Sequence, residues 1–205
     1  MATPPDPGSA EMFESIYVRA GDDLDAIPWA RLAPSPALVA WLEDITIRPG
    51  ASALVVGCGL GDDAEALSSR GLSTTGFDVS PTAIARCRER FPATAVHYLV
   101  ADVFELPGAW SRAFELIVEI RTLQSLPPGT RQDAARSIGE TLAPGGRMLV
   151  VAYARHDRRA VNGPPWPVTE DELAAFEAVG LTRARSDDEP LNGDGDRTFT
   201  IVYTR

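Results

Sequence analysis

A glycine-rich loop in the first half of the chain has residue types suited to binding a ligand. The residues Gly57-Cys58-Gly59-Leu60-Gly61-Asp62-Asp63 directly follow a short apolar run. Glycines let the backbone turn tightly and approach a ligand closely, and a helix that begins after them offers free N–H groups. A dinucleotide fingerprint would have glycine or alanine where this chain has Asp62. That carboxylate would repel a pyrophosphate but is acceptable beside a cationic ligand, so a nicotinamide dinucleotide is disfavoured.

Two more carboxylates follow the next apolar runs along the chain. Asp78 ends the second run, where an acidic residue can bind both hydroxyls of a ribose. Asp102 follows the third run, where a carboxylate can accept from an adenine amine while Val103 offers its backbone N–H. Three successive strand ends with suitable polar groups predict a nucleoside-type ligand more strongly than the glycine loop alone.

Residues that could act on a second substrate follow the fourth and fifth apolar runs. Glu119 and Arg121 come after the fourth run, and Tyr153 and His156 come after the fifth. We interpret Glu119, Tyr153 and His156 as catalytic candidates, because a hydroxyl acceptor needs a general base nearby. The alternatives are a salt bridge from Glu119 to Arg121 or a cofactor-side hydrogen bond, and for His156 a solvated loop position.

Two tryptophans lie in proline-flanked irregular segments, at Trp29 and Trp166. A tryptophan on a stiff loop could close over a pocket and offer a flat face to an acceptor. The alternative is a loop pinned to the core by its largest side chain. With Arg121, these two tryptophans are the substrate-binding candidates.

The elements that must position these residues alternate along the chain. Apolar runs predict strands, and helical spacing predicts helices of about ten residues between them. The expected strands are 53–56, 72–77, 95–100, 114–120, 148–153, 181–185 and 197–204, and the expected helices are 10–19, 37–45, 63–70, 81–90, 131–142 and 169–179. The pattern predicts an α/β fold: a doubly wound, Rossmann-like, seven-stranded and mostly parallel sheet with helices on both faces. The last two strands are too close for a helical crossover, so the C-terminal strand should be antiparallel.

Composition limits the classes of partner. The 205 residues include 19 basic and 29 acidic ones, a net charge of −10. This balance disfavours nucleic acids and anionic membrane surfaces, so we expect neither as a partner. We also expect no signal peptide, no membrane span, no metal site and, with two cysteines, a cytoplasmic location. We predict a flexible N-terminal tail and lid segment over residues 1–36 and a single domain over 37–205.

Four motifs carry a resemblance to a known family. LVVGCGLGDDAEAL, GFDVSPTAIARCRERFP, YLVADVFELP and LAPGGRMLVVAY resemble successive motifs of the class I S-adenosylmethionine-dependent methyltransferases, over roughly residues 37–205. Val55 stands where many members have an acidic residue. The thiopurine-methyltransferase-like branch, with small thiol and halide methyltransferases, is similar in lacking that residue and in having an acidic residue at the place of Asp63. IPWARLAPSPALVAWL and NGPPWPVTEDEL also resemble this branch.

The resemblance implies S-adenosyl-L-methionine as cofactor and S-adenosyl-L-homocysteine as product. The three glycines would line the methionine part, Asp78 would hold the ribose, and Asp102 would hold the adenine amine between two valines. The implied cofactor-binding residues are Gly57, Gly59, Gly61, Asp63, Asp78, Val79, Asp102, Val103 and Glu119.

The expected function is methyl transfer to a small-molecule acceptor. We expect a hydroxyl acceptor, such as a sugar or glycoside precursor, with His156 or Glu119 as general base. The alternative within the same class is S-methylation of small or aromatic thiols, because a thiol is partly ionised near neutral pH and needs little help. An alternative from another class is a non-catalytic sensor or scaffold that binds S-adenosylmethionine. The sequence leaves the oligomeric state open between monomer and homodimer.

Overall fold

The computed structural model describes residues 4–155, 162–190 and 197–205. Its strands form a seven-stranded sheet of order β3-β2-β1-β4-β5-β7-β6. The chain divides into two compact units, residues 1–102 and 103–205, which are described separately below. Among the described residues, no helix combines the length and the apolar character that crossing a membrane would require.

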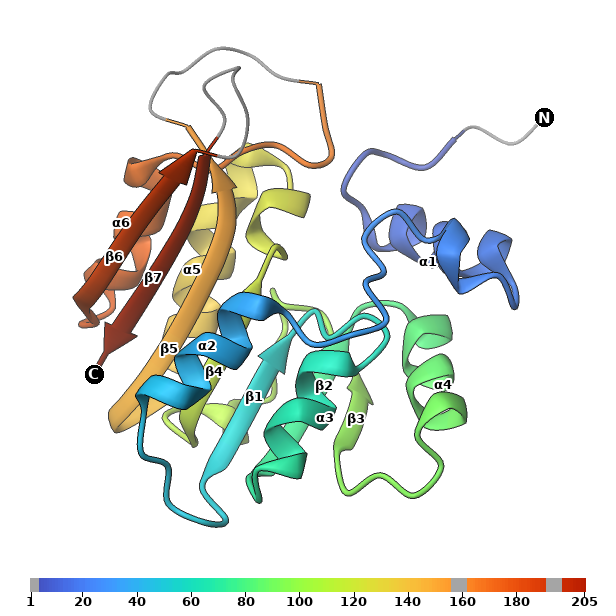
Figure 1. The fold of residues 1–205 in the computed structure, drawn as a ribbon. Coiled ribbons are helices and arrows are strands. Elements are labelled where there is room, and N and C mark those ends of the chain that lie inside the picture. Colours follow the sequence, from blue (N-terminus) through green and yellow to red (C-terminus); the bar gives the residue numbers. More distant parts are fainter. Residues whose placement is uncertain (1–3, 156–161, 191–196) are drawn as a thin grey trace. The chain divides into compact units, whose positions relative to one another are not determined.

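The first unit is a parallel three-stranded arrangement with helices packed against it (Figure 1). β1 pairs in parallel with β2, and β2 pairs in parallel with β3. Helix α3 packs against β1 and β2, and α4 packs against β2 and β3. The elements are α1 (Ala10–Ala20), the 3₁₀ turn η1 (Leu24–Ala26), α2 (Pro36–Asp44), β1 (Ser52–Val56), α3 (Asp62–Ser69), β2 (Ser73–Asp78), α4 (Pro81–Arg90) and β3 (His97–Val100).

Local sequence explains where the helices of the first unit begin. The side chains of Ser9 and Ser80 accept hydrogen bonds from backbone N–H groups in the first turns of α1 and α4, as N-cap residues do. Proline occupies the first helical position of α2 and of α4, where its missing N–H costs nothing. Along β1 nearly every side chain is buried, as expected for a parallel strand covered on both faces.

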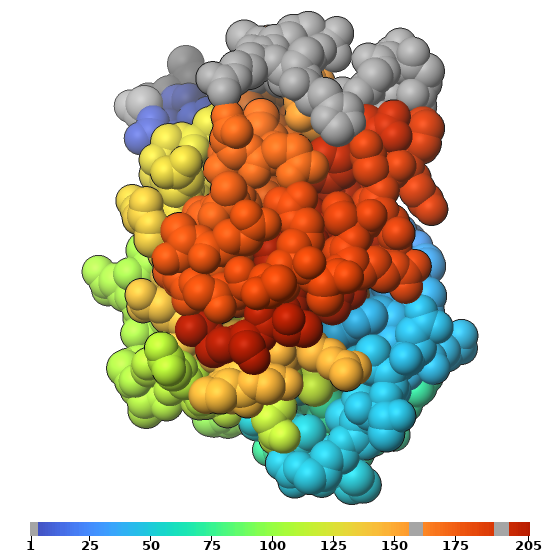
Figure 2. Space-filling model, turned by 90° about the vertical axis from the view of Figure 1, so that its left-hand side faces the viewer, coloured from blue at the N-terminus to red at the C-terminus, as the bar shows by residue number. Residues whose placement is uncertain are grey.

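The second unit combines a parallel strand pair with two antiparallel pairings. β4 and β5 are parallel, and β7 is antiparallel to both β5 and β6. The atoms of α6, β6 and β7, orange to red in Figure 2, gather on one face of this unit. The elements are η2 (Gly108–Trp110), β4 (Phe114–Ile120), η3 (Leu123–Ser125), η4 (Pro128–Thr130), α5 (Arg131–Glu140), β5 (Leu142–Ala154), α6 (Glu170–Ala178), β6 (Thr182–Pro190) and β7 (Arg197–Thr204).

The predicted fold class is confirmed, including the antiparallel C-terminal strand. Two expected strand boundaries were wrong, because β5 begins at Leu142 and not at 148, and β6 ends at Pro190 and not at 185. Gly145 and Gly146, which suggested a turn, exchange backbone hydrogen bonds with Arg205 at the end of the chain. The division into a tail and lid over 1–36 and a domain over 37–205 stays a prediction, and the structure has α1 and η1 within the first of these segments.

Candidate cofactor and acceptor site

The glycine loop at the end of β1 requires glycine for two separate reasons. Gly57, Gly59 and Gly61 have φ angles of 57°, 53° and 90°, in the left-handed region that favours glycine. A Cβ atom at Gly61 would lie 2.5 Å from the Tyr98 hydroxyl oxygen, and one at Gly59 would lie 3.3 Å from the Tyr17 hydroxyl oxygen. The loop therefore presents bare backbone: a side chain at Gly61 would collide with Tyr98, and one at Gly59 would make a tight contact with Tyr17.

Asp78 meets this loop from the end of β2. One carboxylate oxygen accepts from the Gly59 N–H at 3.0 Å, and the other accepts from the Ser80 N–H at 2.9 Å. Burial raises the pKa of Asp78, and the hydrogen bonds from backbone N–H groups, including that of Val79, oppose the rise. A carboxylate has further lone pairs for the hydroxyls of a ribose. Asp78, the carboxylate predicted to bind the ribose, therefore lies in direct contact with the glycine loop.

The expected adenine-side residues differ in burial. Asp102 lies just after β3 at an exposed position, and Val79 is half-buried. Val103, the first residue of the second unit, is buried, and its carbonyl accepts from the Ser137 hydroxyl at 2.6 Å. Their role at an adenine stays a prediction.

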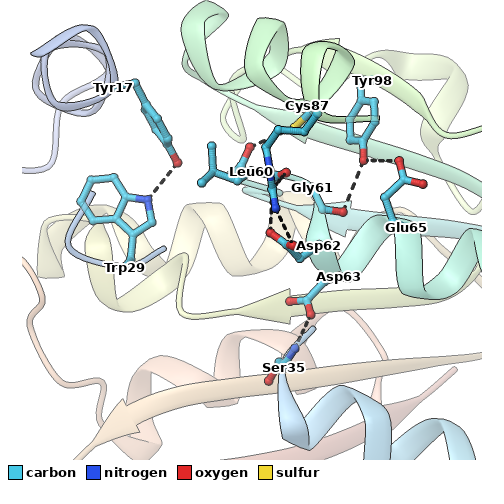
Figure 3. A network of polar contacts seen from close by, with 12 residues as sticks. Tyr17, Trp29, Ser35, Leu60, Gly61, Asp62, Asp63, Glu65, Cys87 and Tyr98 are labelled. Atoms are coloured by element: carbon cyan, nitrogen blue, oxygen red, sulfur yellow. Dashed lines mark hydrogen bonds and ion pairs between the residues drawn. The ribbon is translucent and has the colours of Figure 1, made fainter. Parts of the chain in front are cut away.

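The two aspartates that open α3 have partners within the first unit (Figure 3). Asp62 accepts two hydrogen bonds from the Arg90 guanidinium, at 2.8 and 2.9 Å, so its charge is paired within this unit. Asp63 accepts from the backbone N–H of Ser35 at 2.7 Å, which ties the start of α2 to the glycine loop. Burial raises the pKa of Asp63. Its role toward the cofactor stays a prediction.

An aromatic pair from the N-terminal segment lies over the glycine loop, and the sequence analysis missed one of its members. The Tyr17 side chain is 3% exposed, and its hydroxyl accepts from the Trp29 indole N–H at 2.8 Å (Figure 3). Burial and the charge of Asp78 raise the pKa of Tyr17. The Trp29 ring is 39% exposed and packs edge-to-face on Phe13 and Tyr17. Trp29 is therefore bonded to a tyrosine beside the cofactor loop.

Glu14 is a second residue that the sequence analysis missed. Its carboxylate accepts from the Ser80 hydroxyl at 2.5 Å, the Thr82 hydroxyl at 2.6 Å and the Thr82 N–H at 3.2 Å. Glu14 and Tyr17 are three residues apart and share one face of α1, so helical spacing was the available signal. Glu14 fastens this face to the start of α4, directly after Asp78.

Glu119, a catalytic candidate in the second unit, has a fully buried carboxyl group. Its side chain is 0% exposed, and Oε1 accepts from the backbone N–H groups of Thr122 and Leu123 at 2.7 and 2.9 Å. Oε2 has no hydrogen-bond partner among the described residues. Burial raises the pKa of Glu119 to about 7. The expected salt-bridge alternative with Arg121 is not formed, because backbone N–H groups hold this carboxyl instead.

The structure pairs two other candidates of the second unit with each other. Arg121 donates to the Tyr153 hydroxyl at 2.6 Å, and its guanidinium lies 4.3 Å from the centre of the Tyr153 ring. The phenol oxygen therefore lies beside a fixed positive charge. His156, the third catalytic candidate, lies outside the described residues.

Trp166 lies on the segment between β5 and α6. Its backbone N–H donates to the Gln124 carbonyl at 2.7 Å, and the Gln124 side chain accepts from the Tyr153 N–H at 2.5 Å. The Trp166 ring packs on Gly163, where a Cβ atom would lie 2.5 Å from it. Within the second unit, Tyr153, Gln124 and Trp166 are thus linked, and the role of Trp166 in acceptor binding stays a prediction.

These groups fit a nucleoside cofactor with a cationic methionine part. Bare backbone at Gly57, Gly59 and Gly61 and the buried carboxylate of Asp78 suit the methionine and ribose portions. Within the described ranges, no group of three or more His, Cys, Asp or Glu side chains could hold a metal ion. The glycine loop and Asp78 of the first unit are therefore suited to holding such a cofactor.

Comparisons with known proteins agree with this arrangement. A family model described as Thiopurine S-methyltransferase (TPMT) matches residues 23–194. The chain is 30% identical over 168 residues to "Probable thiol methyltransferase 2" of Arabidopsis thaliana, covering 76% of this chain and 71% of that protein. It is 31% identical over 195 residues to "2-heptyl-1-hydroxyquinolin-4(1H)-one methyltransferase" of Mycobacteroides abscessus, covering 90% of this chain and 83% of that protein.

Solved structures share the fold. One is the 1,6-didemethyltoxoflavin-N1-methyltransferase of Burkholderia thailandensis with bound 1,6-didemethyltoxoflavin and S-adenosylhomocysteine. It superposes with a TM-score of 0.70 at 23% identity, covering 100% of this chain and 93% of that one. The predicted cofactor, S-adenosylmethionine, is confirmed by these comparisons together. The chain belongs to the thiopurine S-methyltransferase family and is an S-adenosylmethionine-dependent methyltransferase.

Proposed function

We propose that this enzyme transfers a methyl group to the sulfur of a small or aromatic thiol. The observation that carries the proposal is the family match over residues 23–194, to a model described by S-methylation. The relative from Arabidopsis thaliana, named for thiols, supports the same chemistry. The family model, described by S-methylation, favours a thiol over the hydroxyl acceptor that the sequence analysis preferred, and relatives that are named as methyltransferases disfavour a non-catalytic binder.

On the cofactor side, the first unit supplies the binding groups. S-adenosylmethionine, when bound, provides a methyl group activated by a positive sulfur. The glycine loop would hold its methionine portion, and Asp78 would hold its ribose. Tyr17 lies beside the loop and Asp78, with its hydroxyl close to Gly59. The hydrogen bond from Trp29 fixes the Tyr17 ring. The ring can therefore exclude water from this place with little further loss of conformational entropy.

On the acceptor side, the second unit supplies a fixed cation. A thiol must lose its proton before its sulfur attacks the methyl carbon and the bond to the sulfonium sulfur breaks. A positive charge near the acceptor favours the thiolate and lowers the thiol pKa. Arg121 has this charge, and its contacts with Tyr153 hold the guanidinium in one place. The proton can leave to solvent, so a thiol acceptor does not require Glu119 or His156 as a base.

The test is methyl transfer from labelled S-adenosylmethionine to a panel of acceptors. The panel contains an aliphatic thiol, an aromatic thiol, a hydroxyquinolone, a phenol and a sugar, each assayed from pH 6 to 9. We expect turnover of the thiols, with a rate that rises as each thiol ionises. Turnover of hydroxylated acceptors without any thiol would refute the proposal.

Arg121 variants test the proposed acceptor chemistry. Arg121→Met removes the charge, and Arg121→Lys keeps it as the matched control. We expect Arg121→Met to lower kcat/KM for an aliphatic thiol at least about tenfold at pH 7 and to move its pH profile to higher pH. An aromatic thiol, which ionises at lower pH, should lose less. Equal losses for both thiols at every pH would show that Arg121 does not stabilise the thiolate.

A further inference from the structure

Arg131 is a buried cation that contacts two loops of the second unit, the turn after β4 and the segment between β5 and α6. It is the first residue of α5, and its side chain is 2% exposed. Its guanidinium forms an ion pair with Glu172, at 3.0 and 3.1 Å to the two carboxylate oxygens. The Glu172 carboxylate also accepts from the backbone N–H of Thr169 at 2.7 Å, at the start of α6. Considered alone, this pair is an ordinary way to hold two helices together.

The remaining donors of Arg131 point to two loops rather than to another side chain. Nε donates to the Leu126 carbonyl at 3.0 Å, and Nη2 donates to the Trp166 carbonyl at 2.6 Å. Nη1 also donates to the Pro167 carbonyl at 3.4 Å. A planar guanidinium can reach these separate acceptors at once, whereas a lysine ammonium is a single point with a different geometry. Arg131 therefore connects the turn after β4 to the segment after β5.

Both connected loops hold groups of the acceptor side. The turn after β4 contains the backbone N–H groups of Thr122 and Leu123 that hold Glu119, and it ends at Leu126. The other loop contains Trp166, whose N–H is held by the Gln124 carbonyl of that same turn. The Trp166 residue is thus held at its N–H from the turn and at its carbonyl by Arg131.

We propose that Arg131 is a positioning residue for methyl transfer, which fixes the Trp166 segment against the turn that holds Glu119. The inference rests on the proposed function and adds to it that Trp166, a substrate-binding candidate from the sequence, contacts the acceptor. Arg131 itself touches neither cofactor nor acceptor in this proposal. It sets the place of the Trp166 ring through the backbone on one side, while Gly163 leaves room for the ring on the other.

Four variants separate positioning from simple stabilisation: Arg131→Lys, Arg131→Met, a double variant and Gly163→Ala. Arg131→Lys keeps the charge but cannot reproduce the fork of hydrogen bonds. The double variant Arg131→Met/Glu172→Met replaces the buried ion pair by apolar groups of similar length, which can restore stability relative to Arg131→Met alone. Gly163→Ala displaces the Trp166 ring directly and leaves the guanidinium in place. The matched control is Arg136→Lys, at an exposed arginine of the same helix that pairs with Asp133.

The kinetic readout is the KM of the thiol acceptor, measured beside kcat, the Kd of S-adenosylmethionine and the melting temperature. We expect Arg131→Lys and Gly163→Ala to raise the acceptor KM at least about tenfold, with the cofactor Kd changed less than about twofold. Arg136→Lys should match the wild type. The double variant should recover the melting temperature lost in Arg131→Met but retain the raised KM. Recovery of the KM together with the melting temperature would overturn the proposal and make Arg131 purely structural.

An optical readout keeps this test separate from the proposed function. The emission of Trp166 is obtained as the difference between each protein and the same protein carrying Trp166→Phe. We expect Arg131→Lys to move this emission to longer wavelength and to increase its quenching by acrylamide, in the absence of any acceptor. An unchanged Trp166 signal would overturn the positioning role even if thiols are turned over. If the wild type methylates no thiol, the proposed function fails, whereas this signal still decides whether Arg131 fixes the segment.

Discussion

Replacing Glu119 by glutamine should change how the free energy of unfolding depends on pH. In the folded protein, burial raises the pKa of Glu119 from 4.5 to about 7. The difference between these values corresponds to about 3 kcal/mol, because each pH unit contributes about 1.4 kcal/mol. The side chain is 0% exposed, so solvent does not screen this effect.

The sign follows from proton binding in the two states. Below pH 4.5, Glu119 is protonated in both the folded and the unfolded chain, and its contribution to stability is fully present. Between pH 4.5 and about 7, the unfolded chain has released this proton while the folded chain keeps it. The stability of the wild type therefore falls as pH rises through this window, and above it the loss is complete. Glu119→Gln has no proton to lose and lacks this decline.

Urea denaturation at pH 5, 6, 7 and 8 measures the effect. We expect the stability of Glu119→Gln relative to wild type to rise across this series by about 2–3 kcal/mol. Glu105→Gln, which removes a carboxylate at an exposed position of the same unit, is the control for a general loss of charge. Parallel stability curves for wild type and Glu119→Gln from pH 5 to 8 would refute the assignment of a raised pKa to this carboxyl.

Two further substitutions test the first unit. Gly61→Ala should destabilise the protein by about 1–3 kcal/mol, because the new Cβ meets the Tyr98 hydroxyl at a left-handed φ, and it should weaken S-adenosylmethionine binding. Thermal denaturation and calorimetry check this, with Gly71→Ala as a control at a left-handed position that has open space. Glu14→Gln should weaken the attachment of α1 to α4. An amide has only one oxygen to accept the hydrogen bonds from the start of α4, including those of Thr82. Hydrogen exchange should then be faster in α1, and unchanged exchange there would contradict this anchoring role.

The sequence predicts the elements of the sheet well where the apolar signal is local. β4 coincides with the expected 114–120, and α4 with the expected 81–90. The start of β5 was missed because glycines at 145 and 146 indicate a turn locally. Their backbone groups are instead paired with Arg205, which is close in space but distant in sequence. A short window of sequence does not contain such a partner.

The candidate site shows the same limit at the level of side chains. Motif spacing predicts that Asp78 lies next to the glycine loop, because the carboxyl ends of parallel strands share one edge of a sheet. The partner of Asp62 was not predictable, since Arg90 lies at the far end of the next helix. Glu119 likewise accepts from N–H groups whose direction depends on the turn after β4, which residue types alone do not specify.

The two cysteines of the chain make the glycine loop open to observation by chemical labelling. Cys58 lies inside this loop, and the Cys87 thiol donates to the Gly59 carbonyl at 3.1 Å; both thiols are free and buried. A thiol reagent can reach either sulfur only when the loop or its surroundings open. The rate of alkylation therefore measures how often this one region opens, without any engineered probe. A ligand that closes the loop would lower the alkylation rate.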